Sequence, residues 1–260
     1  MSVSLKTKIL LAYRSGDICA LPECERRGRR LSVDSEVGDP TNVGQAAHIE
    51  GENPGTNKNP ASARYNPKMS DEERNSFHNL IYLCGTCHKR IDTLPQGQIE
   101  YSVEHLKKIK SDHEKKVRQA MLDAFSSVGF PELQEATHWA SSVSPSTITA
   151  DYSLLRIEDK IQKNDLDADA RGVIAMGLGV ANEVSRYIQS VAQTDFEFPE
   201  RLKAGFLEEY WRLKKDGVGG GELFELMCRF AQKGFERQAQ RSAGLAVLVH
   251  LFETCEVFKK

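Results

Sequence analysis

The sequence predicts an α+β fold, in which a small domain with two short strands precedes a domain made of helices alone. Four of the six cysteines form two close pairs in the first third of the chain, Cys19 with Cys24 and Cys84 with Cys87. Two short apolar runs lie between or beside these pairs and are suited to strands. Beyond residue 150 the apolar residues recur only at the spacings of three and four that are typical of helices.

The elements of the first domain follow one another in a plain order. Residues 43–49 predict the first strand, and the Gly-, Pro- and Asn-rich stretch 51–67 cannot be regular structure throughout. Residues 70–73 form a capping box, which predicts the start of a short helix. Residues 80–83 predict the second strand, and the apolar spacing over 103–121 predicts an amphipathic helix.

The second half of the chain changes in composition. Residues 126–150 are rich in serine and threonine without a sustained period, which predicts a linker. Apolar patterns then predict one helix over 173–191 and another over 202–213, and further helical sequence from Leu223 onward. We therefore expect a first domain over residues 1–125 and an all-α domain over residues 151–260.

Bulk properties fit a globular protein. The hydrophobic fraction is 40%, the charged fraction is 28% and the formal net charge is −2, so charge does not identify a partner. The first 13 residues lack the pattern of a signal peptide, and the longest apolar run, 243–252, is about half of what a membrane span requires. We expect a cytoplasmic protein that is not in a membrane.

The paired cysteines predict a metal site. In a reducing compartment, close cysteine pairs indicate metal more often than disulfides. Cys19, Cys24, Cys84 and Cys87 supply four thiolates, the set that suits tetrahedral zinc. Sulfur fills all four positions, so this zinc is expected to be structural, and any catalysis needs another ion.

Three segments around these cysteines resemble the HNH endonucleases. They are Ala46-Ala47-His48-Ile49, Asn79-Leu80-Ile81-Tyr82-Leu83 and the run from Cys84-Gly85-Thr86-Cys87-His88 to Asp92. The resemblance covers about residues 15–115, and the stretch Arg64 to Arg74 is similar to the form found in bacterial defence nucleases. Membership of this family implies a ββα-metal fold, with a hairpin and a following helix around one divalent ion.

The resemblance also implies roles for individual residues. His48 matches the general base that takes a proton from the attacking water, and a histidine suits this role because its ordinary pKa is near neutral. Asn79 matches the residue that holds the base or its loop. His88 matches a metal ligand, and Asp92 lies four residues later, on the same face of a continuing helix. The ion would be Mg²⁺ or another divalent metal. Many family members have an Asp or His ligand where this chain has Ala47.

Basic residues near these motifs are candidates for contact with double-stranded DNA. Clustered guanidiniums neutralise phosphates, although a solvated turn explains such a cluster equally well. The candidates are Arg26, Arg27, Arg29, Arg30, Arg64 and Lys89. No base-reading motif is present, and RNA remains open as a substrate.

The C-terminal half resembles the helical domains of ABC-three component systems in three segments, 207–210, 221–225 and 251–258. This resemblance implies attachment to an ABC-type ATPase through a middle-component protein; packing within the chain or a homodimer is the alternative. The expected function is that of an HNH DNase acting as the effector of a bacterial anti-phage or restriction-like system. The alternatives are an autonomous site-specific HNH nuclease and a non-catalytic zinc module that binds DNA or a protein.

Overall fold

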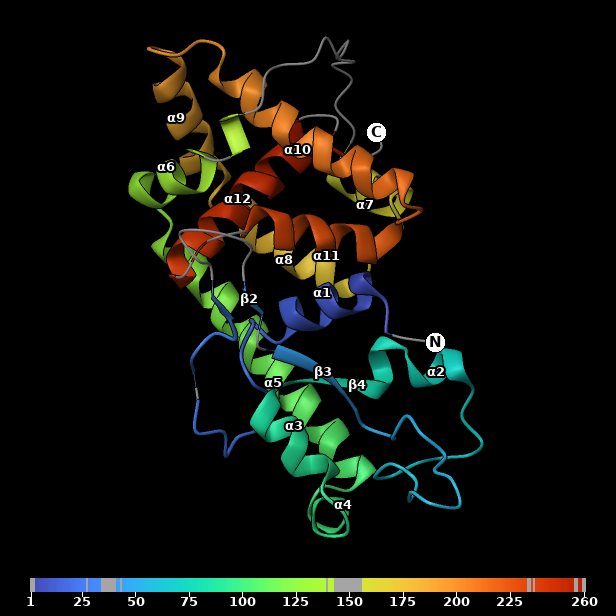
Figure 1. The fold of residues 1–260 in the computed structure, drawn as a ribbon. Helices are drawn as coiled ribbons and strands as arrows, with labels where there is room; N and C mark the ends of the chain where they lie inside the picture. Colours follow the sequence, from blue (N-terminus) through green and yellow to red (C-terminus); the bar gives the residue numbers. More distant parts are fainter. Residues whose placement is uncertain are drawn as a thin grey trace. The chain divides into compact units, whose positions relative to one another are not determined.

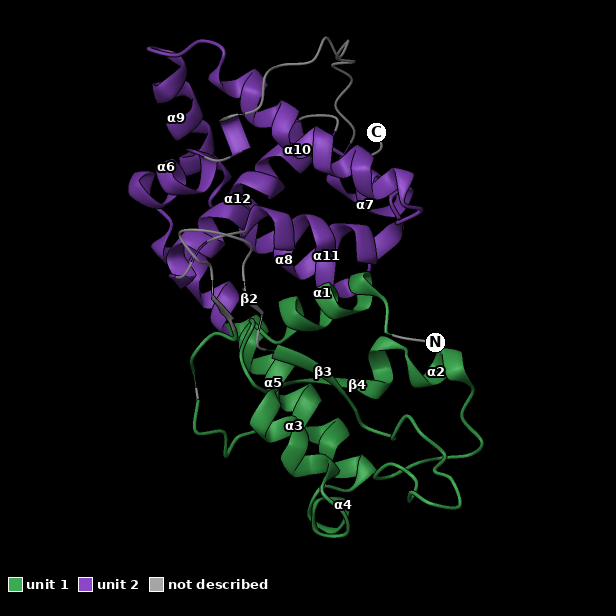
Figure 2. Ribbon diagram, viewed as in Figure 1, with its two compact units in different colours: residues 1–119 green, residues 120–260 purple. Residues whose placement is uncertain are grey.

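The chain folds into two compact units, residues 1–119 and 120–260 (Figure 2). The computed structural model describes residues 3–26, 28–33, 41–42, 44–138, 140–142, 156–232, 235, 237–254 and 257–258. The division falls a few residues before the boundary expected at residue 125. The helix α5, Val103–Asp123, contains this division.

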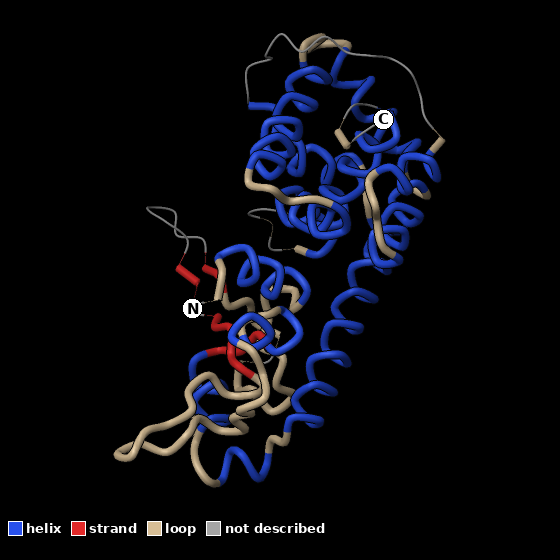
Figure 3. The backbone as a smooth tube through the Cα atoms, turned by 90° about the vertical axis from the view of Figure 1, so that its right-hand side faces the viewer, coloured by secondary structure: helices blue, strands red, loops and turns tan. Residues whose placement is uncertain are grey.

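The centre of unit 1 is an antiparallel hairpin of β3, Gly44–His48, and β4, Leu80–Cys84, close to the two predicted strands. Gly44 pairs with Cys84, and His48 pairs with Leu80. Cys84 and His48 therefore lie at opposite ends of the hairpin. Residue 44 has to be a glycine, because an added Cβ would lie 2.1 Å from the Tyr82 hydroxyl. A second short ladder joins β1, Ser32–Val33, to β2, Thr41–Asn42; Figure 3 shows these strands in red.

Helices pack on the hairpin and extend the unit. Both α1, Leu5–Arg14, and α3, Gly85–Asp92, contact the two strands, and Figure 1 shows them on opposite sides of the hairpin. The predicted capping box is confirmed: Ser70 caps α2, Asp71–Arg74, and the Glu73 side chain returns to the Ser70 backbone. The remaining helices are η1, Phe77–Asn79, α4, Gln96–Glu100, and α5, which confirms the helix predicted from residue 103.

Unit 2 is helical throughout its described part. Its elements are η2 (Ala124–Ser127), α6 (Phe130–His138), η3 (Ala140–Ser142), α7 (Ile157–Lys163), α8 (Ala168–Leu178), α9 (Ala181–Ala192), α10 (Phe198–Lys215), α11 (Gly220–Ala231) and α12 (Gln238–Thr254). Helix α12 is buried on every side and packs against α6, α8, α9 and α11. Such a central helix explains why its sequence is apolar all round rather than on one stripe.

Two expectations for this half are corrected. The stretch expected to be a linker contains α6, because Leu133, Ala136 and Thr137 give it a buried face despite the polar composition; residues 143–150 lie outside the described part of the chain. The single helix expected over 173–191 is two helices, with Gly179 as the C-cap of α8. Within the described residues, no helix combines the length and the apolar character needed to cross a bilayer.

Candidate functional site

The four cysteines of the predicted metal site come together in unit 1. Cys19 and Cys24 lie in the loop after α1, Cys84 ends β4, and Cys87 is in the first turn of α3. All four are buried and none is in a disulfide. Their sulfur atoms lie within 4.8 Å of one another, and the Cys24 and Cys84 sulfurs are 3.8 Å apart. Two thiolates at zinc distance on a tetrahedron are separated by about 3.8 Å, so this cluster can hold a metal ion such as zinc.

Burial and hydrogen bonds shift the pKa of three of these thiols in different directions. Burial raises the pKa of the Cys19 thiol to about 12, and burial also raises the pKa of Cys87. Burial opposes ionisation of Cys84 as well, but hydrogen bonds from Cys87 and from the neighbouring thiols outweigh it and lower the pKa of Cys84. A cation bound among these sulfur atoms would offset the burial that opposes ionisation of Cys19 and Cys87.

His48 is the last residue of β3 and is half-buried. Its Nε2 lies 3.4 Å from Oδ1 of Asn75, the C-cap of α2. The Asn75 amide is oriented by its other end, because Nδ2 donates to the Asp71 carbonyl at 2.9 Å. Oδ1 can only accept, so the His48 proton is on Nε2. The nitrogen of His48 that can take a proton is therefore Nδ1.

Asn79, which directly precedes β4, holds the backbone that directly follows β3. The Glu50 N–H donates to Asn79 Oδ1 at 2.9 Å, and Asn79 Nδ2 donates to the Glu50 carbonyl at 3.0 Å and to the Arg74 carbonyl at 2.9 Å. The three residues that contribute these groups, Glu50, Arg74 and Asn79, are all buried. The side chain predicted to hold the loop of the base thus fixes the backbone two residues beyond His48.

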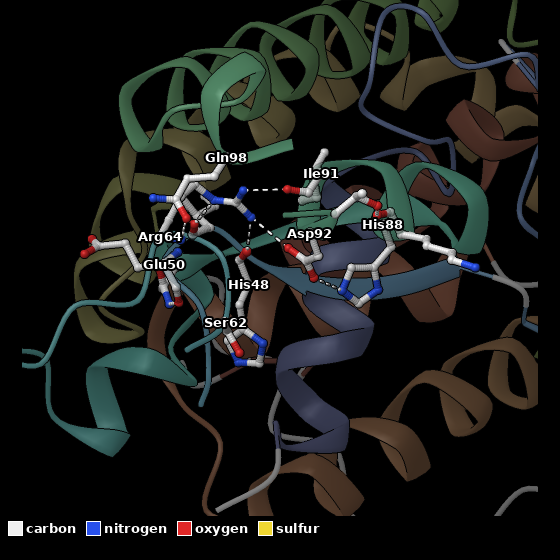
Figure 4. Close-up of polar contacts among 12 residues, drawn as sticks. His48, Glu50, Ser62, Arg64, His88, Ile91, Asp92 and Gln98 are labelled. Atoms are coloured by element: carbon white, nitrogen blue, oxygen red, sulfur yellow. Dashed lines mark hydrogen bonds and ion pairs between the residues drawn. The ribbon is translucent and has the colours of Figure 1, made fainter. Parts of the chain in front are cut away.

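His88 and Asp92 lie one turn apart on α3 and contact each other. His88 Nε2 is 3.2 Å from Asp92 Oδ2, while His88 Nδ1 is 2.7 Å from Oε1 of Gln45 on β3. Asp92 Oδ1 accepts from Arg64 Nη2 at 2.8 Å, and the same nitrogen lies 3.5 Å from the His48 carbonyl. Figure 4 shows this series of contacts from His48 through Arg64 and Asp92 to His88.

Arg64 is an anchor within the domain rather than the predicted DNA contact. Its side chain is 3% exposed. Besides Asp92, it donates through Nε to the Ile49 carbonyl and through Nη1 to the Ile91 carbonyl, each at 2.6 Å. Burial lowers the pKa of the Arg64 guanidinium, and Asp92 partly offsets this effect. Four of the five guanidinium N–H groups thus have acceptors within the domain.

The other predicted DNA contacts differ in exposure. Arg26, Arg29 and Lys89 are exposed, and Arg26 lines a hollow of about 300 Å³ together with Gln45 and the first residues of α3. Arg30 is half-buried and lies 3.5 Å from the fully buried Asp17, which makes it a partner of that carboxylate. Arg27 lies outside the described residues.

The structure brings the candidate ligands His88 and Asp92 into contact, whereas the His48 imidazole contacts Asn75 instead of either. Gln45 of β3 contacts His88 of α3, whereas His48, three residues later on the same strand, contacts Asn75 at the C-cap of α2. Ala47 is fully buried and offers no ligand atom. Gln45 and Asn75, which orient the two histidines, were missed because neither amide stands next to its histidine in sequence.

No protein-family model matches the sequence, and no curated protein matches it.

Proposed function

We propose that the chain is a metal-dependent HNH-type endonuclease that hydrolyses DNA phosphodiesters. The observation that carries the proposal is an antiparallel hairpin followed directly by a helix. His48 is at the end of the first strand of this hairpin, and the His88–Asp92 pair is on the helix, α3. Arg64 contacts both the His48 backbone and the Asp92 carboxylate, which ties these two parts of the proposed site together. The four-cysteine cluster fits a structural zinc at the base of the same helix.

His48 acts as the general base in this proposal. Asn75 holds the proton on Nε2, so Nδ1 accepts the proton of the water that attacks phosphorus. Asn79 keeps the backbone after His48 in place through both of its amide atoms. Its part is that of a positioning residue.

His88 and Asp92 are the proposed ligands of a catalytic Mg²⁺ or another divalent ion. Their facing atoms, 3.2 Å apart, are a carboxylate oxygen, which suits Mg²⁺ and Mn²⁺, and an imidazole nitrogen, which suits divalent transition ions. When bound, the ion supplies stabilisation of the charge that develops on the phosphate and the leaving oxygen. With Ala47 in place of a third ligand, water and a DNA phosphate would fill the other positions.

The exposed cations Arg26, Arg29 and Lys89 are the proposed phosphate contacts. Arg26 and Arg29 follow Cys24 in the chain, Lys89 is on α3, and all three are exposed. A contact of this kind supplies affinity without base selection and weakens as salt is raised. The proposal therefore includes no sequence preference.

Unit 2 is proposed as a protein-binding module that attaches the nuclease to a defence system. Residues 121–260 carry 16 Lys and Arg against 21 Asp and Glu, a balance that disfavours nucleic acid. Phe196 and Trp211 are exposed by 82% and 57%, and exposed aromatic residues are enriched at protein interfaces. An ABC-type ATPase with its middle-component protein is the proposed partner, and a homodimer is the alternative.

One observation favours a second function class, a zinc module that binds DNA or protein without cutting. Ala47 removes a metal ligand, and both oxygens of Asp92 already have partners in Arg64 and His88. A binding module, however, has no need of an imidazole whose proton is fixed by an oriented amide. An autonomous site-specific nuclease would share the catalytic residues and differ only in cutting one defined sequence.

The test is cleavage of supercoiled plasmid by zinc-loaded full-length protein, with and without Mg²⁺ or Mn²⁺. We expect metal-dependent nicking that His48→Ala reduces by about 100-fold or more, the size of a general-base contribution. The matched control is His78→Ala, since His78 is an exposed histidine in the neighbouring η1. Zinc content should be the same in all three proteins. Equal cleavage by wild type and His48→Ala, or none by wild type in any metal, contradicts the proposal.

A further inference from the structure

Gln45 is the one side chain in the described structure that reaches across from β3 to the imidazole of His88. It is exposed, and its Oε1 lies 2.7 Å from His88 Nδ1. The amide rests against the start of α3, where a Cβ added to Gly85 would lie 3.6 Å from Gln45 Nε2. The amide is thus placed between the strand and the first turn of the helix that bears His88.

This contact determines where the His88 proton is. A side-chain carbonyl oxygen only accepts hydrogen bonds, so His88 Nδ1 has to donate. In the neutral imidazole the other nitrogen, Nε2, then carries a lone pair, and it faces Asp92 Oδ2 at 3.2 Å. Two lone pairs that face each other at this distance repel unless a cation or a proton lies between them.

The spacing suits one shared metal ion. Adjacent ligand atoms about 2.1 Å from an octahedral ion are about 3.0 Å apart, close to the 3.2 Å between Nε2 and Oδ2. Arg64 holds the other oxygen of Asp92 at 2.8 Å, which turns Oδ2 toward His88. Both prospective ligands are therefore oriented from behind by a neighbouring side chain.

We propose that Gln45 positions His88 for metal binding by holding its imidazole in the Nδ1–H tautomer. The proposal rests on the function proposed above, because it assigns Gln45 to the same metal site. Histidine ligands commonly donate their second ring N–H to such an acceptor, and loss of the acceptor typically weakens metal binding by 10–100-fold. Gln45 touches neither the ion nor the substrate, so it is a positioning residue.

The test uses full-length, zinc-loaded protein with Gln45→Leu, which removes the acceptor, and Gln45→Glu, which keeps one. Gln96→Leu, on an exposed glutamine of α4, is the matched control. Proton–nitrogen NMR correlations of the imidazole report the His88 tautomer without metal, and calorimetric titration with Mn²⁺ reports affinity. Mn²⁺ prefers oxygen ligands and binds thiolates less tightly than zinc does, so the four cysteines keep their zinc during the titration.

We expect Nδ1–H in wild type, a mixture of tautomers in Gln45→Leu, and a Mn²⁺ affinity about 10-fold or more lower in that variant. Gln45→Glu should keep the wild-type tautomer and bind Mn²⁺ at least as tightly, and Gln96→Leu should match wild type. Unchanged tautomer and affinity in Gln45→Leu overturn the inference while leaving the metal site intact. Absence of Mn²⁺ binding by wild type overturns the proposed metal site itself, and the two failures are thereby distinguished.

Discussion

Replacement of Arg64 by methionine is expected to destabilise unit 1 severely, although the residue looks like a surface cation in the sequence. Methionine keeps much of the side-chain length but removes every donor. The variant leaves the carbonyls of Ile49 and Ile91 without the two 2.6 Å hydrogen bonds that the guanidinium gives them. One carbonyl follows β3 and the other belongs to the last turn of α3, and the Arg64 guanidinium connects them. The variant therefore removes the connection between the two halves of the proposed site.

The magnitude follows from the two carbonyl contacts. A hydrogen bond from a charged donor contributes about 1.5–3 kcal/mol, so the pair contributes about 3–6 kcal/mol. The ion pair with Asp92 adds little, because the Asp92 side chain is 41% exposed and solvent screens it. For a unit of this size the loss corresponds to a melting temperature lower by about 10–20 °C.

The assay is differential scanning calorimetry at a fixed saturating zinc concentration, because bound metal also contributes to stability. Lys89→Met is the control, since Lys89 is an exposed cation on the same helix. It should melt within about 2 °C of wild type while binding DNA more weakly. If Arg64→Met melts like wild type and loses DNA affinity as Lys89→Met does, Arg64 is a DNA contact and the reasoning is refuted.

Three further variants test other parts of the molecule. Cys87→Ser removes one of four ligands, so native mass spectrometry should show loss of the bound zinc; full retention would contradict a four-sulfur site. Asn79→Ala leaves three backbone groups of Glu50 and Arg74 without their hydrogen-bond partner, and urea denaturation should show a loss of about 3–4 kcal/mol in the free energy of unfolding; a loss under 1 kcal/mol would argue against a positioning role for Asn79. Burial lowers the pKa of His113 below 6.5, with a hydrogen bond to the Ser15 carbonyl and Glu114 opposing. The stabilisation that comes from this lowered pKa is present above pH 6.5. It is lost as the pH falls toward the pKa of His113 in the folded state, because over that range only the unfolded state gains the proton. His113→Gln should therefore lose less stability than wild type between pH 7 and 5.5, as thermal melts at the two pH values would show; an equal loss excludes His113 as the cause.

Local sequence patterns predicted the parts of unit 1 that depend on local chemistry. The strands 43–49 and 80–83 appear as β3 and β4, and the capping box at 70–73 forms as expected because its contacts lie within four residues. The two cysteine pairs were predictable because thiolates have few other uses in such spacing, and their sulfur atoms do meet.

Features that depend on distant partners could not be predicted. The buried side chain of Arg64 donates to the carbonyls of residues 49 and 91, and the Arg64 backbone has a positive φ of 58°. No local sequence pattern predicts either feature. The linker prediction failed over α6 because its polar surface conceals a narrow buried face. The contacts of Gln45 and Asn75 with histidines could not be predicted, because each amide lies beside a histidine that is 43 or 27 residues away in the sequence.

The central claim is that one domain holds a sulfur-bound zinc and a separate hydrolytic ion whose ligands face a base. Anomalous diffraction from crystals grown with zinc and Mn²⁺ and a DNA duplex tests it most directly. The account predicts a zinc peak among the four cysteine sulfurs and a manganese peak at His88 and Asp92, with a phosphate between the manganese and His48 Nδ1. A manganese peak elsewhere, or a phosphate that His48 does not reach, would contradict it.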